Sequence, residues 1–88
     1  MTVIDRIRER MALLAPSFLE ILDDSGLHAG HAGASGGGHF RLTIVSPVFV
    51  GKRTMERHRM VYDALGKMMQ QDIHALAIAA KTPDEFSS

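Results

Sequence analysis

Histidine is the residue type through which this chain could do metal chemistry. The sequence has five histidines, His28, His31, His39, His58 and His74, and no cysteine. Imidazole nitrogens bind zinc, copper, iron and nickel, whereas thiolate sites require cysteine. The chain can therefore offer nitrogen and oxygen ligands to a metal centre, but it can build neither a disulfide nor a thiolate site of its own.

Two of these histidines lie in an unusual glycine-rich loop. His28 and His31 stand within residues 26–38, where six of the thirteen residues are glycine. A loop of this length is usually functional or mobile, and glycine at this density makes it flexible. Two histidines three residues apart could bind zinc or nickel adventitiously, whereas a strong site needs three or four ligands at fixed geometry.

The other three histidines lie in predicted secondary structure. His74 begins a strand, and an imidazole at the end of an element can project toward a partner. His39 also begins a strand, and we predict a structural role for it. His58 lies on an apolar helix stripe, so we predict a partly buried side chain that hydrogen-bonds the backbone or a neighbouring loop.

A basic cluster is the second feature that could carry function. Its members are Lys52, Arg53, Arg57 and Arg59, which together with Glu56 give a local charge of +3 over eight residues. A basic turn that opens a helix can bind phosphate through backbone N–H groups and the helix dipole. Such a patch would suit nucleic acid, an acidic protein or glutathione carboxylates. It could equally be a solvated face whose arginines pair with Asp23, Asp24 and Asp63.

Composition limits the remaining functions. Ten basic and ten acidic residues cancel, so no net charge attracts the chain to nucleic acid or membrane. No apolar run approaches the roughly 18 residues of a membrane span, and the amphipathic N-terminus is not a secretory signal. The sequence has neither a nucleophile elbow nor a phosphate-binding GK[ST] motif. We therefore predict a soluble, cytoplasmic protein that is not an enzyme.

Hydrophobic spacing predicts the elements that hold these residues. Thr2 begins an amphipathic helix, with Asp5 placed for a capping box, and Pro16 ends it. Residues 18–24 and 39–46 are predicted strands that flank the glycine-rich loop. Two strands separated by a loop indicate a hairpin, and so an antiparallel pair.

The second half of the chain is predicted to return to the sheet through a helix. This helix extends from about Thr54 to Gln71, and Gly66 could kink or divide it. Its predicted core stripe comprises Met55, His58, Tyr62, Leu65 and Met69, with Val61 and Met68 beside it. Residues 73–80 form a third strand, and Thr82 caps a short last helix.

The third strand is predicted to have two unlike faces. One carries His74, Leu76 and Ile78, and the other carries alanines, whose small side chains would let a helix approach closely. The order helix, strand, strand, helix, strand, short helix predicts a three-stranded sheet with helices on one face. The last strand follows a crossover helix, so it could lie parallel to a strand of the hairpin.

Four segments resemble the BolA family. They are FVGKRTMERHRMVYDAL at 49–65, HALAIAAKTPDEF at 74–86, HFRLTIVSPVF at 39–49 and LEILDDSG at 19–26. The resemblance covers nearly the whole chain. It implies one domain over residues 1–88 with an α/β fold like that of class II KH domains. The implied order is αββααβ with a short C-terminal helix.

The family resemblance also implies a function. BolA-like proteins pair with monothiol glutaredoxins of the CGFS type, in a heterodimer that shares a bridging [2Fe–2S] cluster for iron–sulfur trafficking or iron sensing. Glutathione binds through the partner, and no cofactor is expected in the isolated chain. By resemblance His74 is the strand ligand and His28 the loop ligand, with His31 as its alternative. Mixed histidine–thiolate ligation is known in Rieske centres.

The resemblance implies an alternative function as well. Family members have been regarded as DNA-binding transcriptional regulators that use the segment corresponding to Val50–Arg59. The turn here has one glycine, Gly51, whereas the GXXG loop of a KH domain needs two to clamp a nucleotide backbone. This departure and the zero net charge argue against strong DNA binding, while the basic cluster keeps it open.

Overall fold

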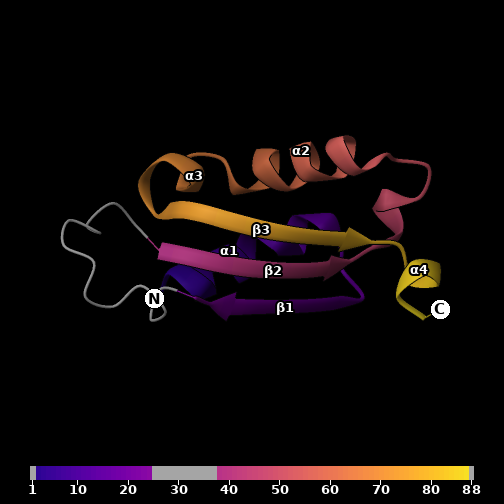
Figure 1. The fold of residues 1–88 in the computed structure, drawn as a ribbon, viewed down its shortest axis with the longest axis horizontal. Helices are drawn as coiled ribbons and strands as arrows, with labels where there is room; N and C mark the ends of the chain where they lie inside the picture. Colours follow the sequence, from indigo (N-terminus) through magenta and orange to yellow (C-terminus); the bar gives the residue numbers. More distant parts are fainter. Residues whose placement is uncertain (1, 25–37, 88) are drawn as a thin grey trace.

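The computed structural model describes residues 2–24 and 38–87. Its elements, in chain order, are α1 (Val3–Met11), β1 (Phe18–Asp23), β2 (Gly38–Val45), α2 (Thr54–Leu65), α3 (Met68–Gln71), β3 (Ile73–Lys81) and α4 (Pro83–Ser87). Short 3-10 turns follow α1 and β2. The αββααβ order and the short terminal helix are therefore confirmed (Figure 1).

The sheet is three-stranded and mixed. Its strand order is β1-β2-β3, in which β1 pairs with β2 antiparallel and β2 pairs with β3 parallel. The hairpin register runs from Phe18 opposite Val45 to Asp23 opposite Phe40. Both predicted pairings are confirmed. As a result β2 and β3 begin at the same end of the sheet, beside each other (Figure 1).

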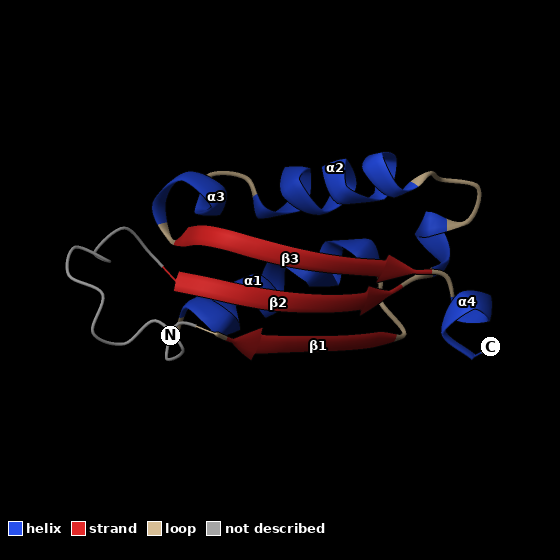
Figure 2. Cartoon of the chain, viewed as in Figure 1, coloured by secondary structure: helices blue, strands red, loops and turns tan. Residues whose placement is uncertain are grey.

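Helices α1, α2 and α3 pack on one face of the sheet, as predicted, with α1 behind the strands in Figure 2, whereas α4 lies at the end of the sheet. The core between them is built from alternate residues of β2 and from the inner faces of the helices. Its buried members are Ile7, Met11, Phe40, Leu42, Ile44, Phe49, Val61, Leu65, Met68 and Ile73. Alternation in β2 sends Phe40, Leu42 and Ile44 to this core and Arg41 to the opposite face.

The opposite face of the sheet carries exposed side chains in the part of the chain that the structure describes. Ala75 and Ala77 of β3 are exposed there, so the expectation that the alanine face would receive a helix is wrong. The core-facing side of β3 carries Leu76, Ile78 and Ala80 instead. The physical reason is that the larger side chains bury more apolar area, and so they decide which face the helices cover.

The predicted core stripe of the second helix is partly wrong. Leu65 is buried, but Met55 is 77% exposed and Tyr62 is 41% exposed. The helix packs through Val61 and Leu65, one turn apart, so its outer face carries Met55 and Tyr62. Gly66, with φ 58°, ends α2 and divides it from α3, a conformation that glycine adopts without a steric penalty.

Both ends of the described chain are capped by reciprocal hydrogen bonds. At α1 the Asp5 N–H donates to Thr2 Oγ1 over 3.1 Å, and the Thr2 N–H donates to Asp5 Oδ2 over 3.2 Å. At α4 the Thr82 N–H donates to Glu85 Oε1 over 2.9 Å. Both predicted caps are confirmed. Among the described residues, no helix is long and apolar enough to cross a membrane.

Candidate functional site

His74 occupies an irregular position at the start of β3. The parallel register matches Gly38 with Ile73 and His39 with Ala75, which leaves His74 as an extra residue. Ile73 is buried, whereas His74 and Ala75 are both exposed. The prediction that His74 shares a face with Leu76 is therefore wrong, because the bulge interrupts the strand alternation. The bulge instead presents the imidazole to solvent.

His39 lies next to His74 across the two strands. Their ring centres are 5.1 Å apart, with planes tilted by 43°. The sequence predicted only a structural role for His39. No sequence signal indicated this pairing, because it depends on β2 and β3 being neighbours and on the bulge between them. Sequence reasoning therefore missed the second imidazole at the start of the sheet.

A hollow of about 380 Å³ lies on the sheet beside His39. His39, Arg41, Ala75 and Asp24 are among its lining residues. The Arg41 guanidinium pairs with the Asp24 carboxylate, which the sequence had offered as a partner for the arginines of the basic cluster instead. The small alanine side chains of β3 leave room above the strand. The hollow is therefore open to a partner beside His39.

Among the described residues, His58 is the one further histidine. His58 is partly buried in α2, as predicted. His28 and His31, the two loop candidates, lie outside the described residues. Within residues 2–24 and 38–87 there is no group of three or more histidine, aspartate or glutamate side chains that could hold a metal ion. The described part of the chain thus offers at most a partial ligand set.

The basic cluster divides into one partly buried arginine and three exposed cations. The Arg57 side chain is 13% exposed. Its Nε donates to the Lys52 carbonyl over 2.8 Å, and its Nη1 donates to the Ala80 carbonyl over 3.0 Å. The guanidinium also binds both Glu85 oxygens, at 2.6 and 3.1 Å. Arg57 therefore links the start of α2 to the end of β3 and to α4.

Glu85 completes this link. Its carboxylate accepts hydrogen bonds from Arg57 and from the Thr82 backbone, which together lower the pKa of Glu85 to about 2. The sequence identified Glu85 only as a helix cap and missed its ion pair. Phe86, the next residue, stacks on Phe18 of β1 with ring centres 4.8 Å apart. These contacts hold α4 against the end of the sheet.

Lys52, Arg53 and Arg59 are the exposed members of the cluster. The N-terminus of α2 lies in this cluster. It is already partly occupied by a carboxylate of the same chain, that of Glu56. The Glu56 carboxylate accepts a hydrogen bond of 3.0 Å from the Arg53 N–H. An incoming phosphate would therefore compete with Glu56 for the backbone donors and the helix dipole.

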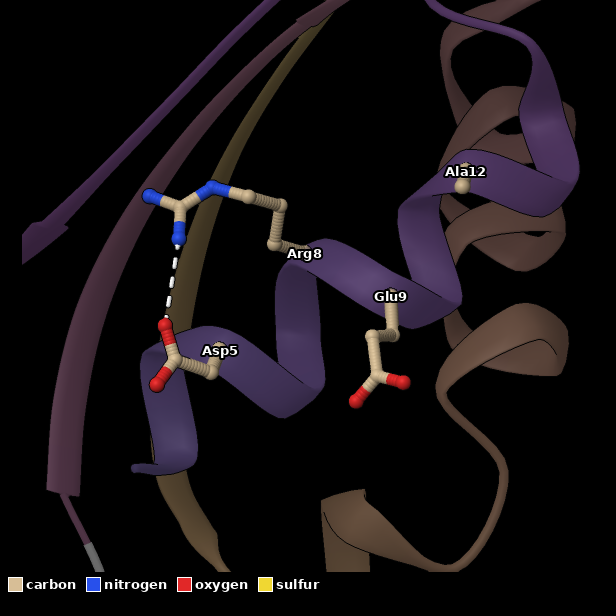
Figure 3. Close-up of a pocket in the computed structure, with 4 residues that line it drawn as sticks. All are labelled: Asp5, Arg8, Glu9 and Ala12. Atoms are coloured by element: carbon tan, nitrogen blue, oxygen red, sulfur yellow. Dashed lines mark hydrogen bonds and ion pairs between the residues drawn. The ribbon is translucent and has the colours of Figure 1, made fainter. Parts of the chain in front are cut away.

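A further depression, of about 570 Å³, lies along α1 and is lined by Asp5, Arg8, Glu9 and Ala12 (Figure 3). All four residues belong to one exposed helix face. Hydrogen bonds with Thr2 lower the pKa of Asp5, and the ion pair of 3.3 Å with Arg8 adds a smaller effect in the same direction. These contacts are those of a solvated helix surface, so we assign the depression no function.

Comparison with known proteins identifies the family. The family model described as BolA-like protein matches residues 11–85. The chain belongs to the BolA family. The Escherichia coli protein named DNA-binding transcriptional regulator BolA is 38% identical over 87 residues, which is 98% of this chain and 81% of that protein.

Plant BolA-family proteins are similar too. SufE-like protein 1, chloroplastic/mitochondrial, of Arabidopsis thaliana is 47% identical over 91% of this chain, but the match spans only 24% of that longer protein. The solved structure of BolA1 from Arabidopsis thaliana has a TM-score of 0.84 at 41% identity, with 97% of this chain and 96% of that chain covered. The fold expected from the sequence is thus the fold of a solved BolA structure.

Proposed function

We propose that this protein is a non-enzymatic partner of a monothiol glutaredoxin, with which it co-ligates a bridging [2Fe–2S] cluster. Membership of the BolA family motivates the proposal. The observation that supports it most is the exposed position of His74, at the register shift where β3 begins. Such a ligand is accessible to a second protein, whereas a buried histidine would not be.

The donor set fits a shared cluster. The chain has no cysteine, so it can supply only nitrogen or oxygen ligands. The described residues hold no complete metal-binding group, so further ligands must come from elsewhere. In the proposed complex these are thiolates of glutaredoxin and of the glutathione that it binds. The second ligand from this chain is a loop histidine, His28 or His31. When bound, a cluster ligated in this mixed way supplies one-electron chemistry at a raised potential.

Co-expression with a monothiol glutaredoxin tests this proposal. We expect the purified heterodimer to show the visible absorption and circular dichroism of a [2Fe–2S] cluster. His74→Ala should abolish these signals and leave the far-ultraviolet spectrum of the chain unchanged, because His74 is exposed. His58→Gln is the matched control and should retain the cluster. Visible spectra that are the same with and without His74 would rule out its ligand role.

DNA binding is the second candidate function. It is favoured by the name of the Escherichia coli relative, DNA-binding transcriptional regulator BolA, and by the three exposed cations Lys52, Arg53 and Arg59. Arg57 is engaged within the fold, and Glu56 occupies part of the helix N-terminus. We therefore expect weak binding that depends strongly on salt.

Charge reversal separates this function from the first. Lys52→Glu with Arg53→Glu should weaken DNA binding and reduce the slope of log affinity against log salt by about 2, since each phosphate contact contributes about 0.9. The variant should still form the glutaredoxin complex if the two surfaces are separate. Absence of DNA binding by the wild type at moderate salt would end the second proposal. The cytoplasmic location remains a prediction.

A further inference from the structure

We propose that His39 and His74 together form a binding site for a divalent transition-metal ion, which needs neither a glutaredoxin nor a cluster. The site is carried by two neighbouring strands rather than by the glycine-rich loop. It thus makes His39, which the sequence predicted to be structural, a metal ligand. The argument rests on ring geometry, on the bulge and on the surroundings of the two rings.

The ring geometry suits one shared ion. Two imidazoles that bind a tetrahedral ion through nitrogen–metal bonds of about 2.0–2.1 Å have ring centres roughly 5 Å apart. The centres of His39 and His74 are 5.1 Å apart, and their planes are tilted rather than stacked face to face. The separation of the ring centres is therefore that of two imidazoles that share one ion.

The bulge is the second observation. In a regular parallel ladder His74 would lie on the same face as Leu76, toward the core, with a fixed cross-strand neighbour. The register shift leaves it unpaired instead, opposite the step between Gly38 and His39. Bulges are rare in parallel pairs, and they commonly re-aim a side chain beside a functional site. Here the re-aimed side chain is an imidazole, and the side chain that it meets is another.

The surroundings leave His74 exposed and leave space beside His39. The hollow there has a volume of about 380 Å³ and is lined partly by Ala75 and Ala77, whose side chains are small. The acid that lines it, Asp24, is already paired with Arg41. The two charges offset each other, so the guanidinium does not strongly repel a cation, and the carboxylate is not required as a ligand.

Two imidazoles leave open positions on the ion. Imidazole suits zinc, copper, iron and nickel, whereas magnesium and calcium prefer oxygen ligands. Closed structural zinc sites use four protein ligands, so a two-histidine site should be weak and readily exchanged. Water would fill the remaining positions in the isolated chain. Ligands from a second protein could replace that water.

Calorimetric titration of the full chain with Zn²⁺ alone tests the site. The titration is made on His28→Gln/His31→Gln, so that loop histidines cannot contribute. We expect one ion per chain in this background. Adding His39→Gln or His74→Gln should weaken Zn²⁺ binding at least about tenfold. Tenfold is the lower end of the loss seen when a metal site loses only an outer-shell partner, and here a direct ligand is lost. Replacing both should weaken it little further, because either change alone breaks the chelate.

His58→Gln is the matched control. His58 lies in the first half of α2, where its neighbour Arg57 bonds the Ala80 carbonyl at the other end of β3. The His58→Gln substitution should therefore leave the Zn²⁺ affinity unchanged. Unchanged affinity in His39→Gln would overturn the proposal, as would loss of all binding on replacing His28 and His31 alone. A chain that binds Zn²⁺ as expected but forms no cluster with a glutaredoxin would refute only the proposed function.

Discussion

Replacement of Arg57 should destabilise the fold strongly, although this residue belongs to a surface cluster of positive charge. Arg57 is 13% exposed and donates to two backbone carbonyls, those of Lys52 and Ala80. Hydrogen bonds from charged groups contribute about 1.5–3 kcal/mol each. We take the lower value for each bond, because water regains access to the carbonyls when the side chain is removed. Arg57→Ala should therefore cost about 3 kcal/mol in these two bonds.

Thermal unfolding followed by far-ultraviolet circular dichroism at neutral pH measures this loss. In a domain of this size each 1 kcal/mol lowers Tm by about 4–8 °C, so Arg57→Ala should melt more than about 10 °C below the wild type. Arg53→Ala is the matched control, since its side chain is exposed in the same turn. It should change the free energy of unfolding by no more than about 0.5 kcal/mol. Equal melting temperatures for the two variants would refute the structural role of Arg57.

Three further predictions follow from the described contacts. Because the folded pKa of Glu85 is depressed to about 2, its stabilising contribution is complete above its unfolded pKa and is lost as pH falls toward 2. The wild type should therefore be more stable than Glu85→Gln at pH 7 in urea, and that difference should vanish near pH 2. Leu65→Ala should lower the free energy of unfolding by about 2–5 kcal/mol, whereas Met55→Ala should leave it nearly unchanged. Comparable urea midpoints for the two variants would contradict the observed orientation of α2. Gly66→Ala should cost about 1–3 kcal/mol from backbone strain alone, because the backbone at residue 66 has positive φ and nothing lies within 4 Å of the added Cβ. A crystal structure of that variant should show φ still positive at residue 66.

Much of the fold could be predicted because its signals are local. The Thr2 and Thr82 caps follow from residue types three positions apart, and hydrogen bonds confirm both. The strand of residues 38–45 follows from alternation, and the mixed sheet follows from the order of the elements. Each of these inferences needs only neighbouring residues or chain order, so no tertiary information was required.

Which face of α2 is buried in the core could not be predicted in the same way. Its sequence has apolar residues on more than one stripe, so Met55 and Tyr62 competed with Val61 for the core. Which stripe is buried depends on where α1 and the sheet lie, and that is a property of the whole fold. The buried pair proved to be Val61 and Leu65. Helical spacing alone does not distinguish such overlapping stripes.

The candidate site was predictable only in part. The family resemblance drew attention to His74, and the structure places it in an exposed position. Its neighbour His39 stands 35 positions earlier in the chain. Their proximity arises from the pairing of β2 with β3 and from a one-residue register shift. Both are long-range properties, so no spacing rule links these two histidines.

The central claim is that an imidazole of this chain ligates the iron of a shared cluster. Electron paramagnetic resonance of the reduced heterodimer, with ¹⁵N-labelled histidine in this chain only, tests it most directly. We predict a nitrogen hyperfine coupling whose pattern changes with the label and which is lost in His74→Ala. A cluster that forms in the heterodimer without any coupling to labelled histidine would contradict the claim, because its ligands would then all come from the partner and glutathione.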